Sequence, residues 1–422
     1  MSAGSSASGF SPTSRDGSFA EAPPSPREGR RLGVHFPGLN GLRFLAALFV
    51  VLGHIPLNQQ SRGLPYFDSG ALFFRGAPAV YFFFALSGFL ITYLLLEEID
   101  RHGKIDVERF YLRRVLRIWP VYFVVIGFGL AFYNFILPAL GIEYPVHYRL
   151  STAVALYLFF LPNLMNNLYT VGGILNPTWS IGVEEQYYLL WAPLVRWFPR
   201  RIPILCAVLF AFSFLLFLAL GLNGFEAGWA IGFVGQLKFH FMAAGGLTAW
   251  ALKRNPAQLA RFAALRARGV RLLLWGLLLE FYFLGQSPWG WLGTELLQLS
   301  LYCWLILEVG ARTRPMLSLE NPVLDYLGRI SYGIYMYHMI AVYSASAFFE
   351  RVGADSMPFA VYWAAYHVIA VGGTISLAAI SYRVLERPFL RLKNSSGGSI
   401  SRTSLPGSAP AGDPAIPLSS TR

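Results

Sequence analysis

The stretch Arg43-Phe-Leu-Ala-Ala-Leu-Phe-Val-Val-Leu-Gly-His54 decides the fold of this chain. Two ionisable side chains, Arg43 and His54, stand at its ends, and the apolar residues between them belong to a run long enough to cross a bilayer. At about 100° per residue this spacing completes about three helical turns, so both side chains leave the helix on one face, roughly 16 Å apart. Because such groups are costly in hydrocarbon, we expect this face to line a cavity.

The composition indicates a polytopic membrane protein. Of 422 residues 55% are hydrophobic, 16% are aromatic and only 13% are charged. The formal net charge of +12 would suggest nucleic acid in a soluble chain, but here the basic residues lie between apolar runs, where they set topology and meet anionic lipid. Cys206 and Cys303 are the two cysteines, which excludes a disulfide framework and a cysteine-based metal site. We therefore expect an all-α bundle of transmembrane helices and no binding of nucleic acid.

Both ends of the chain differ in composition from the part between them. Residues 1–37 and 394–422 are rich in Ser, Gly, Pro and Ala, and such segments bury too little apolar surface to order themselves. We predict two disordered cytoplasmic tails around a membrane domain at 38–393. The first apolar run starts near Leu39 without a small-residue cleavage pattern, so we expect it to be retained as a signal anchor.

The apolar runs give the expected number of spans. Most are near the length of about 20 residues that a spanning helix needs. They cover 39–57, 77–97, 118–140, 150–161, 179–198, 202–222, 228–252, 270–284, 291–309, 324–349 and 358–384. The run at 150–161 is short and is followed at once by Pro162 and Asn163, which is typical of a re-entrant or interfacial segment.

The distribution of basic residues tests that interpretation. If the short run does not cross, one side of the membrane receives nearly all Lys and Arg residues, and the opposite loops receive only Arg62, Arg75, Arg149 and Arg351. The positive-inside rule therefore predicts about ten transmembrane helices in the plasma membrane, with both termini in the cytoplasm.

In this topology Arg43 lies near the cytoplasmic face and His54 lies far across the bilayer. An imidazole can take a proton from a hydroxyl and return it to a leaving group, and burial favours the neutral form that a base requires. The alternative is that His54 is a packed, hydrogen-bonded helix residue and that Arg43 reaches back to the interface.

A cluster of arginines precedes the third run. Arg113, Arg114 and Arg117 fall within about one helical turn of Phe110-Tyr-Leu-Arg-Arg-Val-Leu-Arg-Ile-Trp-Pro120. Guanidinium groups bind phosphate with two parallel hydrogen bonds, so the cluster is a candidate site for a phosphorylated cytosolic ligand. The alternative is a basic loop that sets topology on anionic lipid.

Further ionisable residues lie inside the apolar runs. Glu184 and Glu185 are adjacent in the fifth run, where they need partners or protons, and a purely structural ion pair is the less favoured alternative to a site. Lys238 and His240 lie in the seventh run and Glu280 in the eighth, where pairing between helices is the alternative to a site.

The tenth run carries His338, with Tyr335 one turn before it, as either a site wall or a packing contact. The histidines are scattered, without His-Glu-x-x-His spacing, so we predict no metal site. A phosphate-binding Gly-x-x-x-x-Gly-Lys loop and a Gly-x-Ser-x-Gly nucleophile motif are also absent from the sequence.

From about Leu39 to Leu392 these motifs together resemble the integral-membrane acyltransferase family 3. Its signature of a basic residue, ten residues and a histidine is matched by Arg43 and His54. Four more segments are similar to family blocks in the same order: Leu86-Ser-Gly-Phe-Leu90, Arg113-Arg-Val-Leu-Arg-Ile-Trp-Pro120, Trp179-Ser-Ile-Gly-Val-Glu-Glu-Gln-Tyr-Tyr188, and Ser331-Tyr-Gly-Ile-Tyr335 with His338, followed by Glu386-Arg-Pro388.

The resemblance implies transfer of an acyl group, often acetyl, from cytosolic acyl-CoA to a hydroxyl of a glycan, a glycolipid or a glycosylated small molecule. It implies that His54 is the base or a transient acyl carrier, with Arg43 in the same donor channel. Glu184 and Glu185 would position His54 or the acceptor, and Arg113, Arg114 and Arg117 would bind the CoA phosphates. We take Trp179, Ser180, Lys238, Tyr335 and His338 as candidate substrate-binding residues. Acyl-CoA is then a co-substrate, and no permanently bound cofactor is expected.

Some relatives continue into a soluble hydrolase-like domain, whereas this sequence ends at Arg422, soon after Pro388. The resemblance therefore implies that the membrane domain completes the transfer alone or depends on a partner protein. The alternative function is a multi-pass transporter with an intramembrane path for substrate or protons, formed by Arg43, His54, Glu184, Glu185 and Lys238. Transport folds often have paired halves with interrupted helices, and we find no such symmetry in the sequence.

Overall fold

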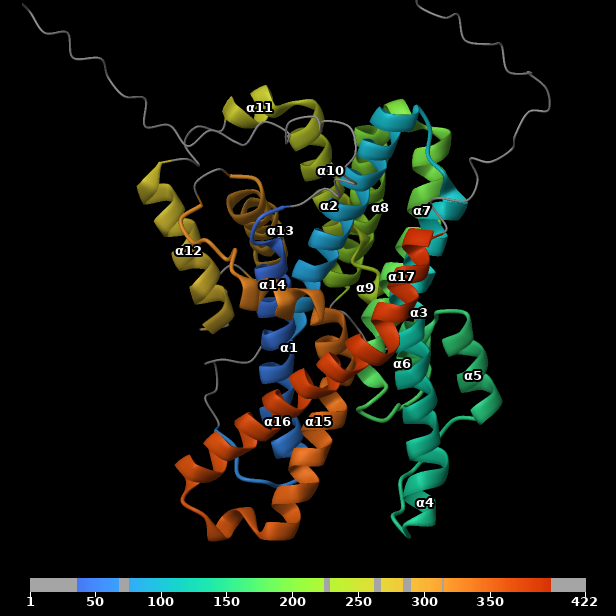
Figure 1. Ribbon diagram of the computed structural model, residues 1–422, viewed down its shortest axis with the longest axis vertical. Coiled ribbons are helices and arrows are strands. Elements are labelled where there is room, and N and C mark those ends of the chain that lie inside the picture. Colours follow the sequence, from blue (N-terminus) through green and yellow to red (C-terminus); the bar gives the residue numbers. More distant parts are fainter. Residues whose placement is uncertain are drawn as a thin grey trace, which may run out of the picture.

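The computed structural model describes residues 36–67, 76–223, 228–261, 267–283, 290–312 and 315–395, and every regular element in these ranges is a helix (Figure 1). The first half contains α1 (Leu39–Ser61), α2 (Gly76–His102), α3 (Val107–Ala131), α4 (Leu137–Ala139), α5 (Leu150–Leu158), α6 (Pro162–Leu168), α7 (Trp179–Trp197) and α8 (Ile202–Leu222). The second half contains α9 (Trp229–Gln236), α10 (Phe239–Arg254), α11 (Pro256–Arg261), α12 (Arg268–Phe283), α13 (Gly290–Gly310), α14 (Pro322–Arg329), α15 (Ser331–Val352), α16 (Phe359–Ser381) and α17 (Arg387–Ser395).

Six segments of the described residues are long and apolar enough to cross a membrane. They are Leu39–Ser61, Gly76–His102, Val107–Ala139, Pro199–Leu222, Gly290–Gly310 and Phe359–Leu392. The all-helical membrane architecture is thus confirmed, while the count of about ten spans stays a prediction. The predicted disordered tails lie outside the described residues, apart from the short stretches 36–37 and 394–395.

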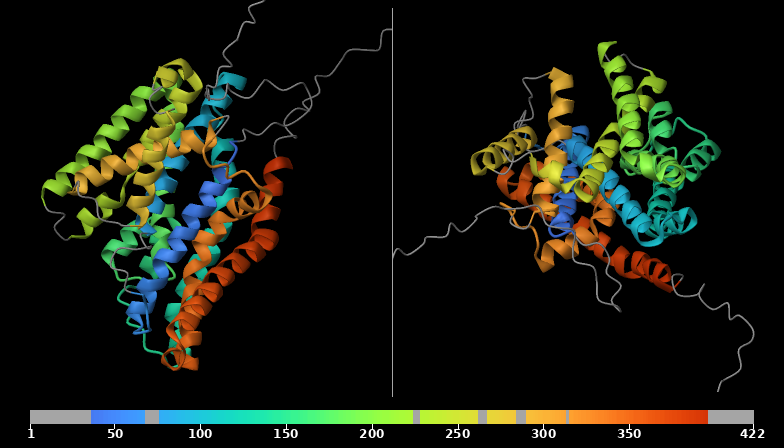
Figure 2. Two further views of the ribbon diagram at one scale, coloured as in Figure 1. Left: turned by 90° about the vertical axis from the view of Figure 1, so that its left-hand side faces the viewer. Right: turned by 90° about the horizontal axis from the view of Figure 1, so that it is seen from above.

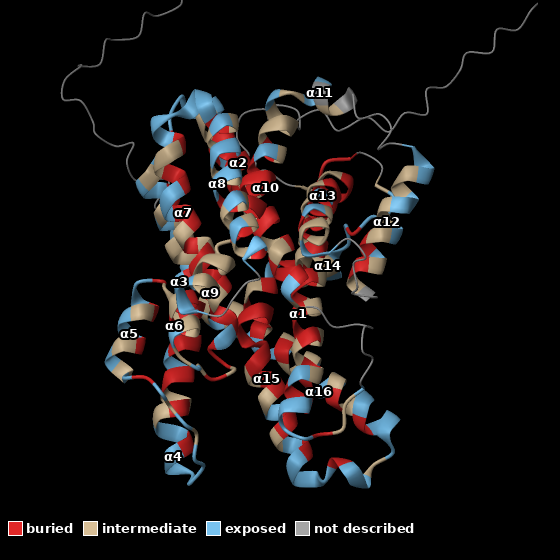
Figure 3. Cartoon of the chain, turned by 180° about the vertical axis from the view of Figure 1, so that it is seen from behind, coloured by how far each residue is buried: buried red, intermediate tan, exposed pale blue. Residues whose placement is uncertain are grey.

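The bundle exposes apolar side chains on its outside and buries its core around α1, α2, α10 and α15 (Figure 3). On α8 the side chains of Ile204, Val208, Phe212 and Leu215 form one stripe, and each is at least 57% exposed. A stripe of this kind is unfavourable in water and matches contact with lipid chains. The long helices run roughly side by side, as a view from the side shows (Figure 2).

Several apolar runs are divided rather than continuous. The run at 150–161 forms α5, whose nine residues are too short to span, and then turns at Phe160, which has a positive φ of 55°. This agrees with the prediction of a segment that does not cross. The runs at 228–252 and 324–349 are also interrupted, at Leu237–Lys238 between α9 and α10 and at Ile330 between α14 and α15.

Helices α2 and α10 cross closely because glycine faces backbone on both sides. A Cβ atom on Gly88 would lie 1.9 Å from the carbonyl oxygen of Met242, and one on Gly245 would lie 1.9 Å from that of Ala85. Small residues that admit such close approach are the usual means of packing helices in lipid, where apolar burial gives little net driving force. This contact fixes α2, which forms one wall of the cavity described below.

We expect Gly88→Ala to destabilise the protein by about 1–3 kcal/mol, because the added methyl group meets backbone that cannot rotate away. The measurement is thermal denaturation of purified protein in detergent. Gly127→Ala on α3 is the matched control, since a Cβ there meets nothing within 4 Å. Equal denaturation temperatures of the two variants would contradict the close α2–α10 contact.

The predicted topology places Arg200, between α7 and α8, in the cytoplasm and Glu143, after α4, on the opposite side; both side chains are exposed. In a variant with alanine at Cys206 and Cys303, we expect a membrane-impermeant maleimide to label Glu143→Cys on intact cells. Arg200→Cys should react only after permeabilisation. Labelling of both cysteines from outside would contradict the predicted arrangement.

Candidate active site

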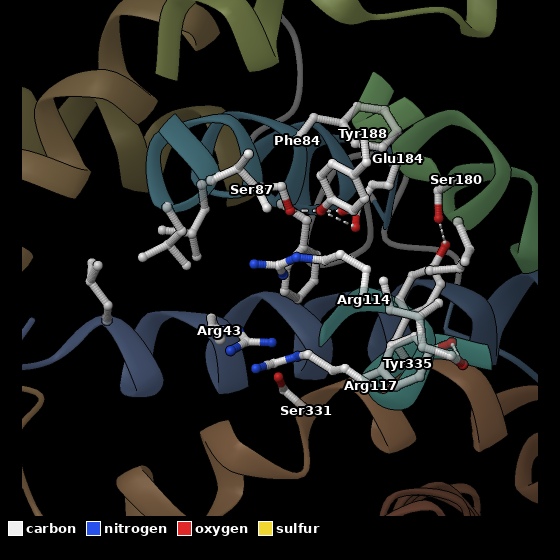
Figure 4. Close-up of a pocket in the computed structure, with 18 of the residues that line it drawn as sticks. Arg43, Phe84, Ser87, Arg114, Arg117, Ser180, Glu184, Tyr188, Ser331 and Tyr335 are labelled. Atoms are coloured by element: carbon white, nitrogen blue, oxygen red, sulfur yellow. Dashed lines mark hydrogen bonds between the residues drawn. The ribbon is translucent and has the colours of Figure 1, made fainter. Parts of the chain in front are cut away.

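A cavity of about 280 Å³ lies between α1, α2, α3, α7 and α15 (Figure 4). Its apolar wall is formed mainly by leucine, isoleucine and phenylalanine from α1 and α2. The polar and charged residues that line it are Asn40, Arg43, Ser87, Arg114, Arg117, Ser180, Glu184, Tyr188, Ser331, Tyr332 and Tyr335. The cavity therefore joins charged groups to an apolar chamber inside the membrane bundle.

Three guanidinium groups point into this space. Arg43 comes from α1, and Arg114 and Arg117 come from α3 (Figure 4). The start of α3 is fixed by Asp106, whose carboxylate accepts a hydrogen bond of 2.9 Å from the backbone N–H of Arg109, so the arginines fall on the first turns of a capped helix.

The guanidinium of Arg114 lies over the ring of Tyr188, with its carbon 5.6 Å from the ring centroid. Within the described ranges no carboxylate forms a salt bridge with Arg43 or Arg117, so the cluster is an electropositive site that fits an anion.

One carboxylate, that of Glu184, faces the arginines across the cavity. Its two oxygens accept hydrogen bonds of 2.9 Å from the hydroxyl groups of Ser87 and Tyr188. These bonds fix the carboxylate to Ser87 of α2 and Tyr188 of α7, and it forms no salt bridge with a guanidinium group of the cavity (Figure 4). The arrangement leaves the arginines available to a ligand and gives the cavity a hydrogen-bond acceptor at its wall.

The opposite wall of the cavity is aromatic. The Tyr335 hydroxyl donates to the carbonyl oxygen of Pro177 at 2.8 Å and lies 2.6 Å from the Ser180 hydroxyl, so this end of α15 is fixed to the start of α7. The ring of Phe83 lies 6.2 Å from that of Tyr335, and both side chains line the cavity. His338 follows Tyr335 by one turn of α15.

His54 lies beyond this wall, against the ring of His338. The centroids of the two imidazoles are 4.8 Å apart, and the Tyr335 ring is 5.9 Å from that of His338. The Nδ1 of His54 donates to the carbonyl oxygen of Val50 at 2.8 Å, which leaves Nε2 as the unprotonated nitrogen of a neutral ring.

The expectation that Arg43 and His54 line one cavity needs correction, because only Arg43 reaches it. Arg43 and His54 nevertheless lie on the same side of α1. Arg43 shares the cavity with Ser331 of α15, and His54 contacts His338 of the same helix. The rings of Phe83 and Tyr335 line the cavity with centroids 6.2 Å apart, and His338, the neighbour of His54, follows Tyr335 by one turn of α15.

Besides His54 and His338, four predicted site residues lie outside the cavity. Arg113 forms an ion pair of 2.9 Å with Glu98 instead of joining the other two arginines. Trp179 packs its ring at 5.9 Å from that of Phe84. Glu185 is buried next to the site. Its neighbour Glu184 points into the cavity, since adjacent residues on a helix face different directions.

Lys238, the fourth, belongs to a separate buried cluster. Its Nζ lies 2.5 Å from the carboxylate of Glu295, which also accepts a hydrogen bond of 2.9 Å from the Nε2 of His240. The Ser213 hydroxyl bonds both to the Nδ1 of His240 and to the carbonyl oxygen of Leu237, at the break between α9 and α10. This cluster stabilises an interrupted helix and does not line the cavity.

Sequence reasoning assigned no role to Ser87, Tyr188, Ser331 or Asn40, which the structure places in the cavity. Ser87 lies in the block Leu86–Leu90, Tyr188 ends the block that begins at Trp179, and Ser331 opens the block that contains Tyr335. The sequence signal that marks these three residues is that each is a polar residue inside one of the motif blocks. In the part of the chain that the structure describes, no group of His, Cys, Asp or Glu could hold a metal ion.

Comparisons with known proteins identify the family and some relatives of this chain. An O-acetyltransferase of Staphylococcus aureus strain COL, named provisionally as such, is 26% identical over 376 residues that cover 84% of this chain and 57% of the relative. The O-acetyltransferase OatA of Staphylococcus aureus strain NCTC 8325 is 25% identical over 372 residues, with the same coverage. The chain thus spans 57% of the length of the curated relatives it matches. No solved structure matches the fold.

The acyltransferase domain family matches residues 36–379, a range that contains α1 to α15 and most of α16. The five motif blocks noted above lie in this range, apart from Glu386-Arg-Pro388. The chain belongs to acyltransferase family 3.

Proposed function

We propose that this protein is a membrane O-acyltransferase that moves an acyl group, most simply acetyl, from acyl-CoA to a hydroxyl of a glycan, a glycolipid or a glycosylated small molecule. Membership of the family and the O-acetyltransferase names of the relatives support the class of reaction. The observation that carries the proposal is the position of three guanidinium groups in one cavity, close to a pair of imidazoles. Tyr335 lines this cavity and its ring lies next to that of His338, which contacts His54.

The donor end of the reaction is assigned to the arginines. Arg114 and Arg117 would bind the phosphates of CoA, with Arg43 deeper in the same cavity. The leucine and isoleucine side chains from α2 would surround the long, flexible arm that carries the thioester. A donor held in this way directs its reactive end toward Tyr335 and the imidazole pair.

The chemistry is assigned to His54. Its unprotonated Nε2 would take the proton of the acceptor hydroxyl as the oxygen attacks the thioester carbonyl carbon. A carbon–oxygen bond forms, the carbon–sulfur bond breaks, and the imidazolium returns its proton to the departing thiolate. The products are the O-acyl ester and free CoA, and the imidazole ends neutral, ready for another cycle.

The remaining assignments follow the predicted topology. With both termini in the cytoplasm of a plasma-membrane protein, the arginine cluster faces the compartment that contains acyl-CoA. Ser180, Tyr335 and Glu184 are assigned to the path between donor and acceptor, since all three line the cavity. A partner protein that presents the acceptor would complete the transfer if the membrane domain does not do so alone.

We expect His54→Ala to abolish acyl transfer and to leave the folded protein in the membrane, because it removes the only assigned base. The assay supplies labelled acetyl-CoA to membranes that contain their own acceptors and measures alkali-labile ester and released CoA. His367→Ala is the matched control. His367 also lies in an apolar helix and donates from Nδ1 to a backbone oxygen four residues earlier, that of Trp363. Full activity of His54→Ala would remove the catalytic assignment.

Arg113 and Arg117 are one helical turn apart but have different surroundings. Substituting each in turn therefore distinguishes a specific contact with phosphate from a general effect of positive charge. We expect Arg117→Ala to raise the KM for acetyl-CoA by about tenfold or more, since a charge-assisted hydrogen bond contributes roughly 1.5–3 kcal/mol. Arg113→Ala loses only a partly buried ion pair with Glu98 outside the cavity and should leave that KM unchanged. Equal effects of the two substitutions would argue against phosphate binding by the cavity arginines.

A further inference from the structure

We propose that His338 is the proton-holding partner of His54, so that the two imidazoles act as one site for a single proton during acyl transfer. The inference rests on the proposed function, since it concerns the base of that reaction. It goes beyond a wall or packing role for His338, because it assigns each ring nitrogen of that residue a separate task.

The hydrogen bonds of His338 fix which nitrogen carries the proton. Its Nδ1 lies 2.5 Å from the carbonyl oxygen of Tyr335, and since a carbonyl only accepts, Nδ1 must donate. The Nε2 of the neutral ring is therefore an acceptor. His338 is fully buried, and its Nε2 has no hydrogen-bond partner among the described residues. A buried acceptor left in this state is costly and calls for an explanation.

His54 has the same arrangement one helix away. Its Nδ1 donates to Val50, so its Nε2 also carries a lone pair. The two rings, with centroids 4.8 Å apart and planes at 59°, present no hydrogen atom for a bond between their Nε2 atoms. One added proton changes this, because an imidazolium Nε2–H of one ring can donate to the lone pair of the other.

The surroundings supply no competing partner in the described part of the chain. No carboxylate there pairs with either ring, and the electrostatic neighbour of His338 is His54 itself. Tyr335 lies one turn before His338 on α15, and the first residue of α2, Gly76, faces His54. Arg43 is three turns away on α1. Asp68 and Arg75, which precede α2 in the chain, lie outside the described residues.

The proton that the two histidines share comes from the acceptor hydroxyl and ends on the thiolate, so no further reactant is needed. The acceptor hydroxyl loses its proton to the Nε2 of His54 as the carbon–oxygen bond forms. The imidazolium then donates a hydrogen bond to the Nε2 of His338, which holds the proton in place of solvent. When the carbon–sulfur bond breaks, the same proton passes to the thiolate, and both rings return to the neutral form.

Two conservative substitutions separate the two nitrogens of His338. Glutamine places a hydrogen-bonding group near the position of Nε2, whereas asparagine places its amide near Nδ1, beside the Tyr335 carbonyl. We expect His338→Gln to lower kcat by about tenfold and His338→Asn and His338→Ala to lower it by about 100-fold or more, the range for loss of proton-transfer assistance. The KM for acetyl-CoA should not change, since His338 does not line the arginine cavity.

The same pair of substitutions at His367 is the control. His367 also has a buried Nε2 without a partner in the described residues, but its neighbour is Trp363 rather than a second imidazole. Both variants at His367 should retain activity. If His338 only supports packing through Tyr335, His338→Asn will be more active than His338→Gln, and this result would overturn the inference. Equal losses of activity in these two variants, or full activity of His338→Ala, would overturn it as well. Activity in His54→Ala would instead overturn the proposed function itself.

Discussion

The fold has to accommodate three guanidinium groups in one internal cavity of a bundle whose outer surface is apolar. Arg43, Arg114 and Arg117 share a cavity with a single carboxylate, that of Glu184, and its oxygens are already bonded to Ser87 and Tyr188. Removing such charges from water is costly unless they gain partners. The cavity therefore favours an anionic ligand, although the buried carboxylate of Glu386 outside it also interacts electrostatically with Arg117 and Arg43.

Two helices, α1 and α15, carry the site at two levels. At the first level Arg43 and Ser331 line the cavity, and at the second His54 and His338 lie ring against ring. Between the levels Tyr335 is fixed by hydrogen bonds to Ser180 and Pro177. The separation places the guanidinium groups, which are the proposed donor site, apart from the imidazoles that are proposed to move a proton.

Sequence reasoning succeeded where a single helix determines the answer. The spacing of Arg43 and His54 places both on one side of α1, and the short run at 150–161 is too short to span. It failed where tertiary contacts decide. No local pattern distinguishes Arg117, in the cavity, from Arg113, beside Glu98, because both lie on one face of α3.

Lys238 shows the same limit. Its carboxylate partner Glu295 comes from α13, more than fifty positions along the chain, so the pairing could not be deduced without the fold. The breaks in the helices at Leu237–Lys238 and Ile330 follow from packing and carry no proline or glycine signal at the break itself.

The aromatic layer formed by Phe83 and Tyr335 has a consequence for the energy supply of the cell. An enzyme with ionisable groups at several depths of a bilayer risks becoming a leak, because a continuous file of water between them would let protons flow down their electrochemical gradient. The Tyr335 hydroxyl is held by the Pro177 carbonyl oxygen, and its ring lies beside that of Phe83. Aromatic faces fixed in this way offer water no strong hydrogen-bonding partner, which works against such a file.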